Sequence, residues 1–326
     1  MTIVMVSPHL ASSTTGNHVT AQRWARILRS LGHRVHLCER YDDRPYDAMI
    51  ALHARRNADA AARFHRLFPD RPLIVALTGT DLYHDLPRSA AARRSLEIAT
   101  RLVLLQPEGI EELSPHLRGK ARAIIQSAVA PRARKAVARN GEFAVAVLGH
   151  LRAVKDPLRA AMAARLLPKS SRIAVLHAGA ALEPRYGTRA RAEMARNARY
   201  RWLGELGHAR AQRLLAASRL LVLTSRSEGG ANVVSEALAA GVPIVGSNIG
   251  GTRGVLGAHY PGLYPPGDTR ALAALLERAE RDKDFYGDLR RRCRKLAQLV
   301  RPERELRAWR ALIAEVAPHV GRLTES

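Results

Sequence analysis

The sequence predicts an α/β protein of two domains, each with a parallel β-sheet and helices on both faces of the sheet. Short apolar runs typical of buried strands alternate with longer segments of helical periodicity along nearly the whole chain. This alternation favours parallel sheets, because each helix returns the chain to the edge where the next strand begins. The length of 326 residues also suits roughly two domains.

The first domain is expected over residues 1–130 and is Rossmann-like, although it lacks the standard G-x-G-x-x-G spacing. The helix after its first strand carries Trp24, Leu28 and Leu31 at helical spacing, and Gly32 ends it. Residues 129–142 are rich in Ala, Arg, Pro and Gly and lack strand patterning, so we place the linker between the domains there. Apolar runs predict strands of the first domain at 2–6, 35–37, 48–52, 73–77, 102–105 and 123–125.

The second domain, residues 141–300, repeats the alternation and is also Rossmann-like. The final helix, 303–318, carries Leu306, Trp309 and Leu312 at helical spacing. Strands of the second domain are predicted at 143–148, 172–176, 200–203, 220–223 and 243–246, and two helices at 268–300.

The chain carries 53 Lys and Arg against 29 Asp and Glu, a formal net charge of +24. Such an excess is a mark of nucleic-acid-binding proteins, which stand here as the alternative from another functional class. The arginines, however, occur on almost every predicted helix, aromatic residues make up only 5% of the chain, and no zinc motif or basic tail occurs. We therefore attribute the charge to an arginine-rich composition and expect no specific nucleic-acid partner.

Membrane, targeting and metal signals are missing from the sequence. No apolar run reaches about 18 residues, the length of a membrane span. Residues 1–7 begin directly as a strand and lack the charged region of a signal peptide. Cys38 and Cys293 are far apart, and no H-E-x-x-H, D-x-D or cysteine cluster occurs. The sequence thus predicts a cytoplasmic protein with reduced thiols, no membrane association, and neither metal nor other cofactor.

The most informative stretch of the second domain follows the predicted strand 220–223. Gly229 and Gly230 permit a tight turn and close approach of the backbone to a ligand, and a helix follows. Glu228 and Glu236 flank this turn with the spacing E-x7-E. The first N–H groups of such a helix, with their partial positive charge, suit a phosphate group.

This strand–Gly-Gly–helix unit resembles the donor motif of GT-B glycosyltransferases that use nucleotide-diphospho sugars. The resemblance implies that Glu228 contacts hexose hydroxyls and that Glu236 holds the ribose hydroxyls. It also implies the GT-B architecture, in which two Rossmann-like domains face each other across a cleft and a C-terminal helix crosses back to the first domain. Without the resemblance, Glu236 is interpreted as a solvated helix residue and Glu228 as a carboxylate that caps the helix.

The loop after the predicted strand 143–148 carries basic residues. It resembles the corresponding loop of type 4 glycosyltransferases, in which Gly-Arg is followed by a lysine, and both bases neutralise the departing diphosphate. Here Lys155 keeps its place, His150 stands at the usual Arg position, and Arg152 is assigned the second charge. Fixed cations stabilise the charge that develops when a nucleoside diphosphate leaves. A solvated basic turn is the structural alternative.

Three loops of the first domain follow strands whose carboxyl ends should share one edge of the sheet. Because open parallel sheets bind ligands beyond that edge, we expect the loops to form an anion pocket. Each loop also has a structural interpretation: a turn at Gly16, a solvated helix start at Arg55 and Arg56, and an N-cap at Thr80 or Asp81. The loops contain Gly16 and Asn17, then His53 to Arg56, then Thr78 to Tyr83.

Several phrases in both domains are more specific. They are GNHVTAQRWAR at 16–26, ALHARR at 51–56, ALTGTDLY at 76–83, GHLR at 149–152, and SEGGANVVSEA at 227–237. Together they resemble the selenosugar synthases of selenoneine biosynthesis. The resemblance implies that selenophosphate attacks the anomeric carbon of a UDP-sugar, typically UDP-N-acetylglucosamine, that UDP leaves, and that the phosphoryl group is then lost. It also implies pathway partners that supply selenophosphate and consume the selenosugar.

The resemblance and the positions of the loops assign the site residues. Donor binding is assigned to Gly16, Gly149, His150, Arg152, Lys155, Glu228, Gly229, Gly230, Ala231, Asn232 and Glu236. Acceptor binding is assigned to Asn17, Arg55, Arg56, Thr78, Gly79, Thr80 and Asp81, with Gly16 beside them. The catalytic set is Lys155, Arg152, Asp81 and Glu228.

Selenophosphate is already anionic at selenium, so it needs orientation more than deprotonation, and arginine suits its phosphoryl group. Because Arg55 and Arg56 are adjacent, only one of them is expected to reach it. Asp81 is expected either to contact a sugar hydroxyl or to position the water that removes phosphate. A GT-B enzyme that transfers sugar to a hydroxyl acceptor is the alternative within the same class.

Overall fold

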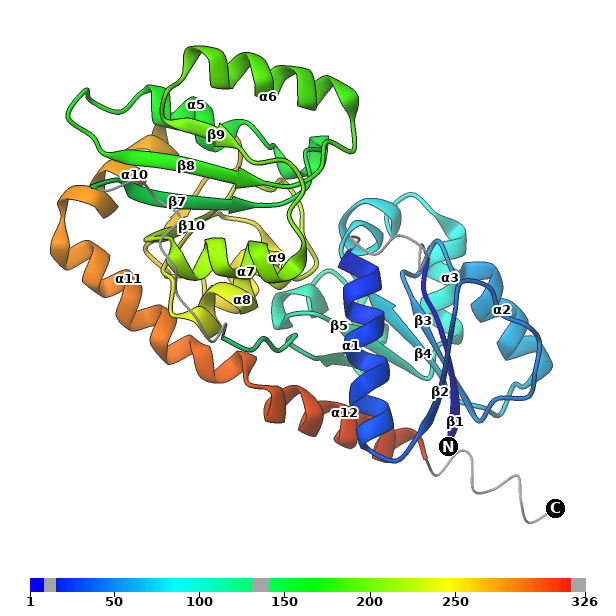
Figure 1. The fold of residues 1–326 in the computed structure, drawn as a ribbon. Coiled ribbons are helices and arrows are strands. Elements are labelled where there is room, and N and C mark those ends of the chain that lie inside the picture. Colours follow the sequence, from blue (N-terminus) through cyan, green and yellow to red (C-terminus); the bar gives the residue numbers. More distant parts are fainter. Residues whose placement is uncertain (9–15, 131–140, 318–326) are drawn as a thin grey trace. The chain divides into compact units, whose positions relative to one another are not determined.

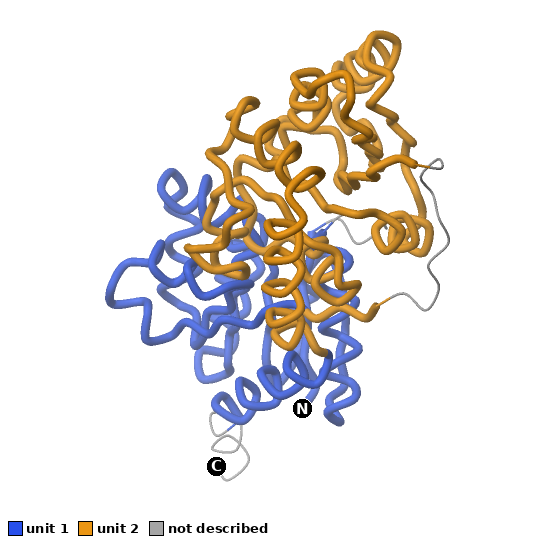
Figure 2. Tube along the Cα trace, turned by 90° about the vertical axis from the view of Figure 1, so that its left-hand side faces the viewer, with its two compact units in different colours: residues 1–126, 302–326 blue, residues 127–301 orange. Residues whose placement is uncertain are grey.

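The chain divides into two compact units, shown in Figure 2. The first unit comprises residues 1–126 with the segment from 302 onward, and the second comprises 127–301. The computed structural model describes residues 1–8, 16–130 and 141–317. Most of the linker expected at 129–142, and the last residue of the helix expected at 303–318, therefore lie outside the described residues.

The first unit contains one parallel sheet with the strand order β2-β1-β3-β4-β5-β6 (Figure 1). Three of its strands match the sequence prediction residue for residue, namely 2–6, 48–52 and 73–77. Apart from Thr2 at the start of the first, each is a continuous apolar run, as expected for a strand buried on both faces. The strands are β1 (Thr2–Val6), β2 (Arg34–Cys38), β3 (Ala48–Leu52), β4 (Leu73–Leu77), β5 (Arg101–Leu104) and β6 (Ala121–Ala123).

Helices cover both faces of this sheet, and alternate strand residues pack against each set. On β1, Ile3 and Met5 join the core that contains α1 and α12, whereas Val4 and Val6 join the core that contains α2 and α3. This two-residue alternation follows from the pleat of a strand. The helices are α1 (Gly16–Ser30), α2 (Ala58–Leu67), α3 (Ala90–Ile98), α4 (Pro115–Arg118) and α12 (Pro302–Val316), with a π-helical turn η1 (Asp81–Asp85) and a 3₁₀ turn η2 (Pro107–Ile110).

The C-terminal helix α12 packs against α1 within the first unit (Figure 1). The rings of Trp24 and Trp309 meet edge to face with centroids 4.8 Å apart. Trp24 Nε1 donates a hydrogen bond of 2.9 Å to the buried carboxylate of Glu305. An aromatic pair of this geometry adds about 0.5–1.5 kcal/mol to the area that it buries. The helix is thus anchored by a specific polar and aromatic contact as well as by its apolar stripe.

The second unit repeats the architecture with the order β12-β11-β10-β7-β8-β9, again parallel throughout. The predicted strands 143–148 and 220–223 match exactly, but β12 was not predicted because two residues are too short to show a pattern. The strands are β7 (Phe143–Leu148), β8 (Ile173–Ala178), β9 (Tyr200–Trp202), β10 (Leu220–Leu223), β11 (Ile244–Ser247) and β12 (Leu263–Tyr264).

The helices of the second unit follow the strands in alternation. Gly241 follows α8 in the left-handed conformation with φ 67°, which is common for a glycine just beyond the end of a helix. The helices are α5 (Arg159–Arg165), α6 (Pro184–Arg196), α7 (His208–Ala217), α8 (Asn232–Ala240), α9 (Gly250–Leu256), α10 (Thr269–Arg281) and α11 (Lys283–Leu296), with 3₁₀ turns η3 (Ala153–Lys155) and η4 (Ala297–Val300).

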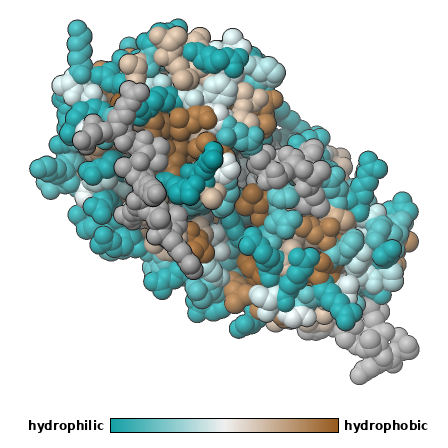
Figure 3. All heavy atoms as spheres, viewed as in Figure 1, coloured by the Kyte–Doolittle hydropathy of each residue, from teal (hydrophilic) through white to brown (hydrophobic). Residues whose placement is uncertain are grey.

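The surface seen in Figure 3 is largely hydrophilic, with smaller apolar areas between the polar side chains. Within the described ranges, no helix combines the length and the apolar character needed to cross a bilayer. Among the residues that the structure describes, the large hydrophobic side chains that are exposed are Leu67, Val129, Leu166, Leu182, Met194 and Leu203.

Candidate functional site

The carboxyl edge of the second sheet brings together the loops after β7 and β10. Arg226 N donates to Val154 O at 2.8 Å, and Thr224 Oγ1 donates to Lys155 O at 2.7 Å. Asp156 ends the turn η3 with φ 43°, and its carboxylate contacts Arg159 at 2.9 Å and Arg226 at 3.6 Å. These bonds hold the two loops in one arrangement although they lie far apart in sequence.

Lys155 and Glu228 form an ion pair between these loops. Ser225 Oγ also donates to Glu228 Oε1, at 2.6 Å. The side chains of Lys155 and Glu228 are only 23% and 12% exposed, so the attraction is less screened than it is between surface charges. The structure therefore brings together the residues that were assigned to the diphosphate and to the sugar. Lys155 is therefore not part of a fully solvated basic turn, the structural alternative.

Glu228 is not the capping residue of α8. The N-cap position belongs to Ala231, which has no side chain that accepts a hydrogen bond, and Glu228 is directed to Lys155 instead. The assigned turn residues Gly229 and Gly230 precede Ala231, and Asn232 opens the helix. Glu236 lies within α8, on a half-buried position, next to the stripe formed by its buried residues.

Two glycines that the sequence reasoning did not single out permit close backbone contacts around this site. A Cβ atom at Gly251, on α9, would lie 2.0 Å from the carbonyl oxygen of Glu228. A Cβ atom at Gly179, after β8, would lie 2.0 Å from the carbonyl oxygen of Gly149. Any other residue at either position would displace the loop that carries an assigned donor residue. The glycine pair Gly250-Gly251 after β11 is the sequence signal for Gly251, whereas Gly179 is a single glycine after β8.

Two histidines at the carboxyl edge of the second sheet, His177 and His150, hold the loop after β7 in place through hydrogen bonds. His177 is completely buried, and its Nε2 donates to Gly149 O at 3.0 Å while Nδ1 accepts from Tyr200 OH at 3.0 Å. Burial lowers the pKa of His177 to about 4, so the imidazole is neutral at pH 7. His150 Nδ1 accepts from Ala180 N at 3.1 Å, which ties the loop after β7 to the loop after β8.

Among the described residues, no contact joins Arg152 to the Lys155–Glu228 pair. Its side chain is exposed, and its charge acts on Glu183. The pKa of Glu183 is held below its ordinary value. The largest cause is a hydrogen bond from the backbone N–H of Ala153, and Arg185 and the charge of Arg152 contribute further. The assignment of Arg152 to the second phosphate charge receives no support from this geometry.

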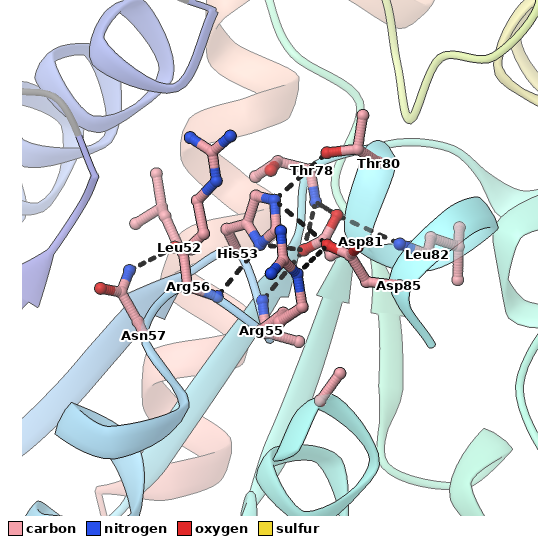
Figure 4. Close-up of polar contacts among 12 residues, drawn as sticks. Leu52, His53, Arg55, Arg56, Asn57, Thr78, Thr80, Asp81, Leu82 and Asp85 are labelled. Carbon is pink, nitrogen blue, oxygen red and sulfur yellow. Dashed lines mark hydrogen bonds and ion pairs between the residues drawn. The ribbon is translucent and has the colours of Figure 1, made fainter. Parts of the chain in front are cut away.

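In the first unit, the loops after β3 and β4 form a second polar cluster, shown in Figure 4. Asp81 is its centre and is completely buried. Its carboxylate accepts backbone N–H groups of Gly79 at 2.8 Å, Thr78 at 2.9 Å, Ala54 at 3.0 Å and Leu82 at 3.2 Å. The sequence predicted that Asp81 contacts a sugar hydroxyl or a water; in the structure its two oxygens accept backbone N–H groups from both loops and so hold the loops together.

The two arginines of the loop after β3 have different surroundings. Arg55 Nε contacts Asp85 Oδ2 on η1 at 2.9 Å. The Arg56 side chain is exposed and extends away from Asp85 toward the end of the cluster where Thr78 and Thr80 lie in Figure 4. No carboxylate among the described residues lies within ion-pair distance of Arg56. Of the two adjacent arginines, Arg56 is therefore the one with an available guanidinium.

Gly16 and Asn17 begin α1, at the same edge of the sheet. Gly16 O accepts from Thr20 Oγ1 at 2.8 Å, an interaction within the helix. The described contacts do not join Gly16 or Asn17 to Arg56 or Thr80, and the preceding loop, 9–15, lies outside the described residues. No cluster of three or more His, Cys, Asp or Glu side chains suited to a metal ion occurs in the described parts of the chain.

Comparisons with known proteins give the family of this chain. Residues 130–300, just over half of the chain, match the family model "Glycosyl transferases group 1". A segment of 80 residues is 36% identical to TuaC of Bacillus subtilis (strain 168), a protein named for glycosyl transfer in teichuronic acid biosynthesis. That match covers 24% of this chain and only 21% of TuaC.

Two solved structures are similar over nearly their whole length. Anabaena Alr3699/HepE, solved with UDP, superposes with a TM-score of 0.79 at 16% identity, covering 97% of this chain and 100% of that one. Sucrose-phosphate synthase from Thermosynechococcus elongatus gives a TM-score of 0.78 at 16% identity, with the same coverage of 97% and 100%. These likenesses confirm the predicted fold class, two Rossmann-like domains of the GT-B type. The chain belongs to the group 1 glycosyl transferases.

Proposed function

We propose that this glycosyltransferase is a selenosugar synthase, which joins the sugar of UDP-N-acetylglucosamine to selenophosphate. The first-domain phrases at 16–26, 51–56 and 76–83, which resemble selenosugar synthases, support the choice of acceptor. The proposal requires no metal or other cofactor. Enzymes that make selenophosphate and that consume the selenosugar would be its pathway partners.

The donor half of the proposal is supported by the Lys155–Glu228 pair beside α8. In the proposed reaction, the bond between the anomeric carbon and the β-phosphate oxygen breaks, and UDP leaves with the bonding electrons. Lys155 stabilises the charge that develops on the diphosphate. Glu228 receives a sugar hydroxyl, and Glu236 on α8 receives the ribose hydroxyls. Anabaena HepE was solved with UDP-glucose, which supports a UDP-sugar as donor here.

The choice of selenophosphate as acceptor is supported by one observation: the carboxylates in the loops after β3 and β4 already have partners within the protein. Asp81 is buried among backbone N–H groups, and Asp85 is paired with Arg55. Transfer to a hydroxyl acceptor calls for a general base, but both of these candidates are already engaged. Selenophosphate needs no base, because its selenium is anionic before it attacks. It needs donors such as the guanidinium of Arg56 and the hydroxyl groups of Thr78 and Thr80.

The proposed reaction has two steps and consumes one water molecule. A lone pair of selenium forms the carbon–selenium bond as UDP departs. Water then attacks phosphorus, the phosphorus–selenium bond breaks, and selenosugar and inorganic phosphate are released. We assign no residue to the second step, since Asp81, the earlier candidate, is engaged in holding the loops.

Mass spectrometry of a reaction with UDP-N-acetylglucosamine and selenophosphate tests the proposal. The expected product is a selenosugar with the isotope pattern of selenium, formed together with UDP and phosphate. Its yield should be unchanged by EDTA. UDP release that depends on a hydroxyl acceptor, without any selenium-containing product, would contradict the proposal and favour the hydroxyl-acceptor alternative. UDP-glucose in a parallel reaction measures the preference for the sugar.

A further inference from the structure

His53 occupies an unusual position at the end of β3. Its side chain is buried, and its backbone has φ 77°, in the left-handed region that only a few non-glycine residues adopt. The backbone N–H of His53 donates to Ala76 O at 2.8 Å, and its carbonyl accepts from Asn57 N at 3.1 Å. The chain thus turns sharply at His53 and points the imidazole back between the loops after β3 and β4, as Figure 4 shows.

The hydrogen bonds of the ring identify its tautomer. Arg56 N donates to His53 Nδ1 at 3.4 Å, and the other neighbour of this nitrogen, Asp81 Oδ2 at 3.9 Å, already accepts backbone N–H groups; we therefore assign Nδ1 as an acceptor without a proton. The proton is then on Nε2, which lies 3.2 Å from Thr80 Oγ1 and 3.7 Å from Asp85 Oδ2. Burial, the main cause, lowers the pKa of His53, and Arg56 and Arg55 add to this, while Asp81 and Asp85 oppose it. The neutral ring that this geometry requires is therefore the form present near pH 7.

This tautomer makes the Thr80 hydroxyl oxygen an acceptor toward His53 and leaves its proton available to another group. Because Thr80 Oγ1 accepts from His53 Nε2, its own proton is free to point elsewhere. The Thr80 side chain is half-buried and lies at the end of the cluster to which Arg56 extends in Figure 4. One ring therefore contacts the backbone of Arg56 through Nδ1 and the hydroxyl of Thr80 through Nε2.

We propose that His53 is a positioning residue of the acceptor pocket, which holds the Thr80 hydroxyl as a hydrogen-bond donor beside the Arg56 guanidinium. The ligand class is an oxyanion of phosphate type, for which one guanidinium and one hydroxyl proton are complementary donors. This inference rests on the proposed function for the identity of the acceptor. It adds a residue that was not assigned to either substrate.

The substitution His53→Asn removes the contact with Thr80 but allows the left-handed backbone at this position to persist. Asparagine tolerates the left-handed conformation, and its side-chain oxygen can accept the Arg56 N–H, but it is too short to reach Thr80. Thr80→Val removes the hydroxyl at nearly constant shape, and Thr80→Ser retains it. His84→Asn is the matched control, because His84 is an exposed histidine of η1.

The experiment measures the affinity of the full chain for thiophosphate, and separately for UDP, by calorimetry. His53→Asn and Thr80→Val should each weaken thiophosphate binding roughly tenfold, the effect of one hydrogen bond to a charged group. UDP affinity should stay unchanged in both variants, and Thr80→Ser and His84→Asn should bind thiophosphate like the wild type. The double variant His53→Asn/Thr80→Val should be no weaker than Thr80→Val, because His53 acts through Thr80.

The inference is overturned if His53→Asn binds thiophosphate as tightly as the wild type, or if the wild type does not bind it at all. Additive losses in the double variant overturn it as well, since they show that His53 acts independently of Thr80. The proposed function is tested by a different measurement, the formation of a selenosugar by the wild type. Binding of thiophosphate without selenosugar formation would support the pocket and reject the selenium chemistry.

Discussion

Lys155 and Glu228 are separated widely in sequence, yet they form an ion pair at the carboxyl edge of the second sheet. The pair depends on the backbone around it. Thr224 bonds to the carbonyl of Lys155, and Gly251 allows α9 to approach the carbonyl of Glu228. A cation and a carboxylate are thereby held where the donor's diphosphate and sugar are expected, and neither charge is left alone in a partly buried site.

Lys155→Ala should reduce turnover by roughly 100-fold or more, because it removes a fixed cation from the leaving diphosphate. Steady-state kinetics with saturating donor measures the effect. Arg152→Ala is the matched control: Arg152 is exposed and lies apart from the pair, so its loss should change turnover only slightly. Equal losses in the two variants would restore Arg152 to the diphosphate site, and normal turnover in Lys155→Ala would remove Lys155 from it.

Glu236→Ala should weaken the binding of UDP itself by about 1.5–3 kcal/mol, the contribution of a hydrogen bond that involves a charged group. The reason is the position of Glu236 on α8: a nucleotide that binds with its phosphates at the start of that helix would bring its ribose toward this carboxylate. Calorimetry with UDP alone measures it. Glu277→Ala, on the partly exposed surface of α10, serves as the control. Unchanged affinity for UDP in Glu236→Ala would reject the assignment.

Acidification should destabilise the second unit through His177. Its folded-state pKa is lowered from 6.5 to about 4, so stability is complete above pH 6.5 and is lost as the pH falls toward 4. The shift corresponds to about 3 kcal/mol for this fully buried ring. Urea unfolding at pH 7 and at pH 4.5 measures the loss.

His177→Gln should be less stable than the wild type at pH 7, because the contacts to Gly149 and Tyr200 are weakened. Its stability should nevertheless change less between the two pH values, since the titrating group is gone. His208→Gln, at the exposed start of α7, should retain the pH dependence of the wild type. The same pH dependence in His177→Gln would show that other groups cause the loss.

The fold was largely predictable from the sequence because both sheets are parallel and covered on both faces. Strands such as 73–77 and 220–223 are then continuous apolar runs with polar loops on each side, and their bounds are unambiguous. The two-residue strand β12 carries no such pattern, since it pairs only at the sheet edge, through Gly246 and Ser247.

The candidate site was predictable where a motif has fixed spacing, and less so where contacts form through space. The sequence placed Lys155 and Glu228 in one site, but their direct pairing depends on the packing of two loops. Asp81 was expected to meet substrate because it lies in a polar loop, and it proved to be a buried acceptor of backbone N–H groups. His53 was placed in one of the predicted loops but was given no role of its own, because its left-handed backbone cannot be predicted from a residue pattern.

Arg56→Ala should raise the KM for selenophosphate roughly tenfold or more while UDP binding stays nearly intact. The Arg56 guanidinium is exposed and extends away from Asp85 in Figure 4, and its planar fork can donate two parallel hydrogen bonds to a phosphoryl group. Arg56→Lys should recover only part of the loss, because an ammonium group lacks that fork. Initial rates at varied selenophosphate and saturating UDP-sugar measure both variants.

Arg55→Ala is the control that the structure offers for this prediction. Arg55 is half-exposed and already paired with Asp85 at 2.9 Å, so its removal should cost at most about 1 kcal/mol of stability. Its effect on the selenophosphate KM should be small, because the Arg55 charge is directed to a carboxylate rather than to the Thr78 and Thr80 end of the cluster. If Arg55→Ala raises that KM and Arg56→Ala does not, the two arginines exchange roles and Asp85 becomes part of the acceptor pocket. If neither does, selenophosphate does not bind at these loops.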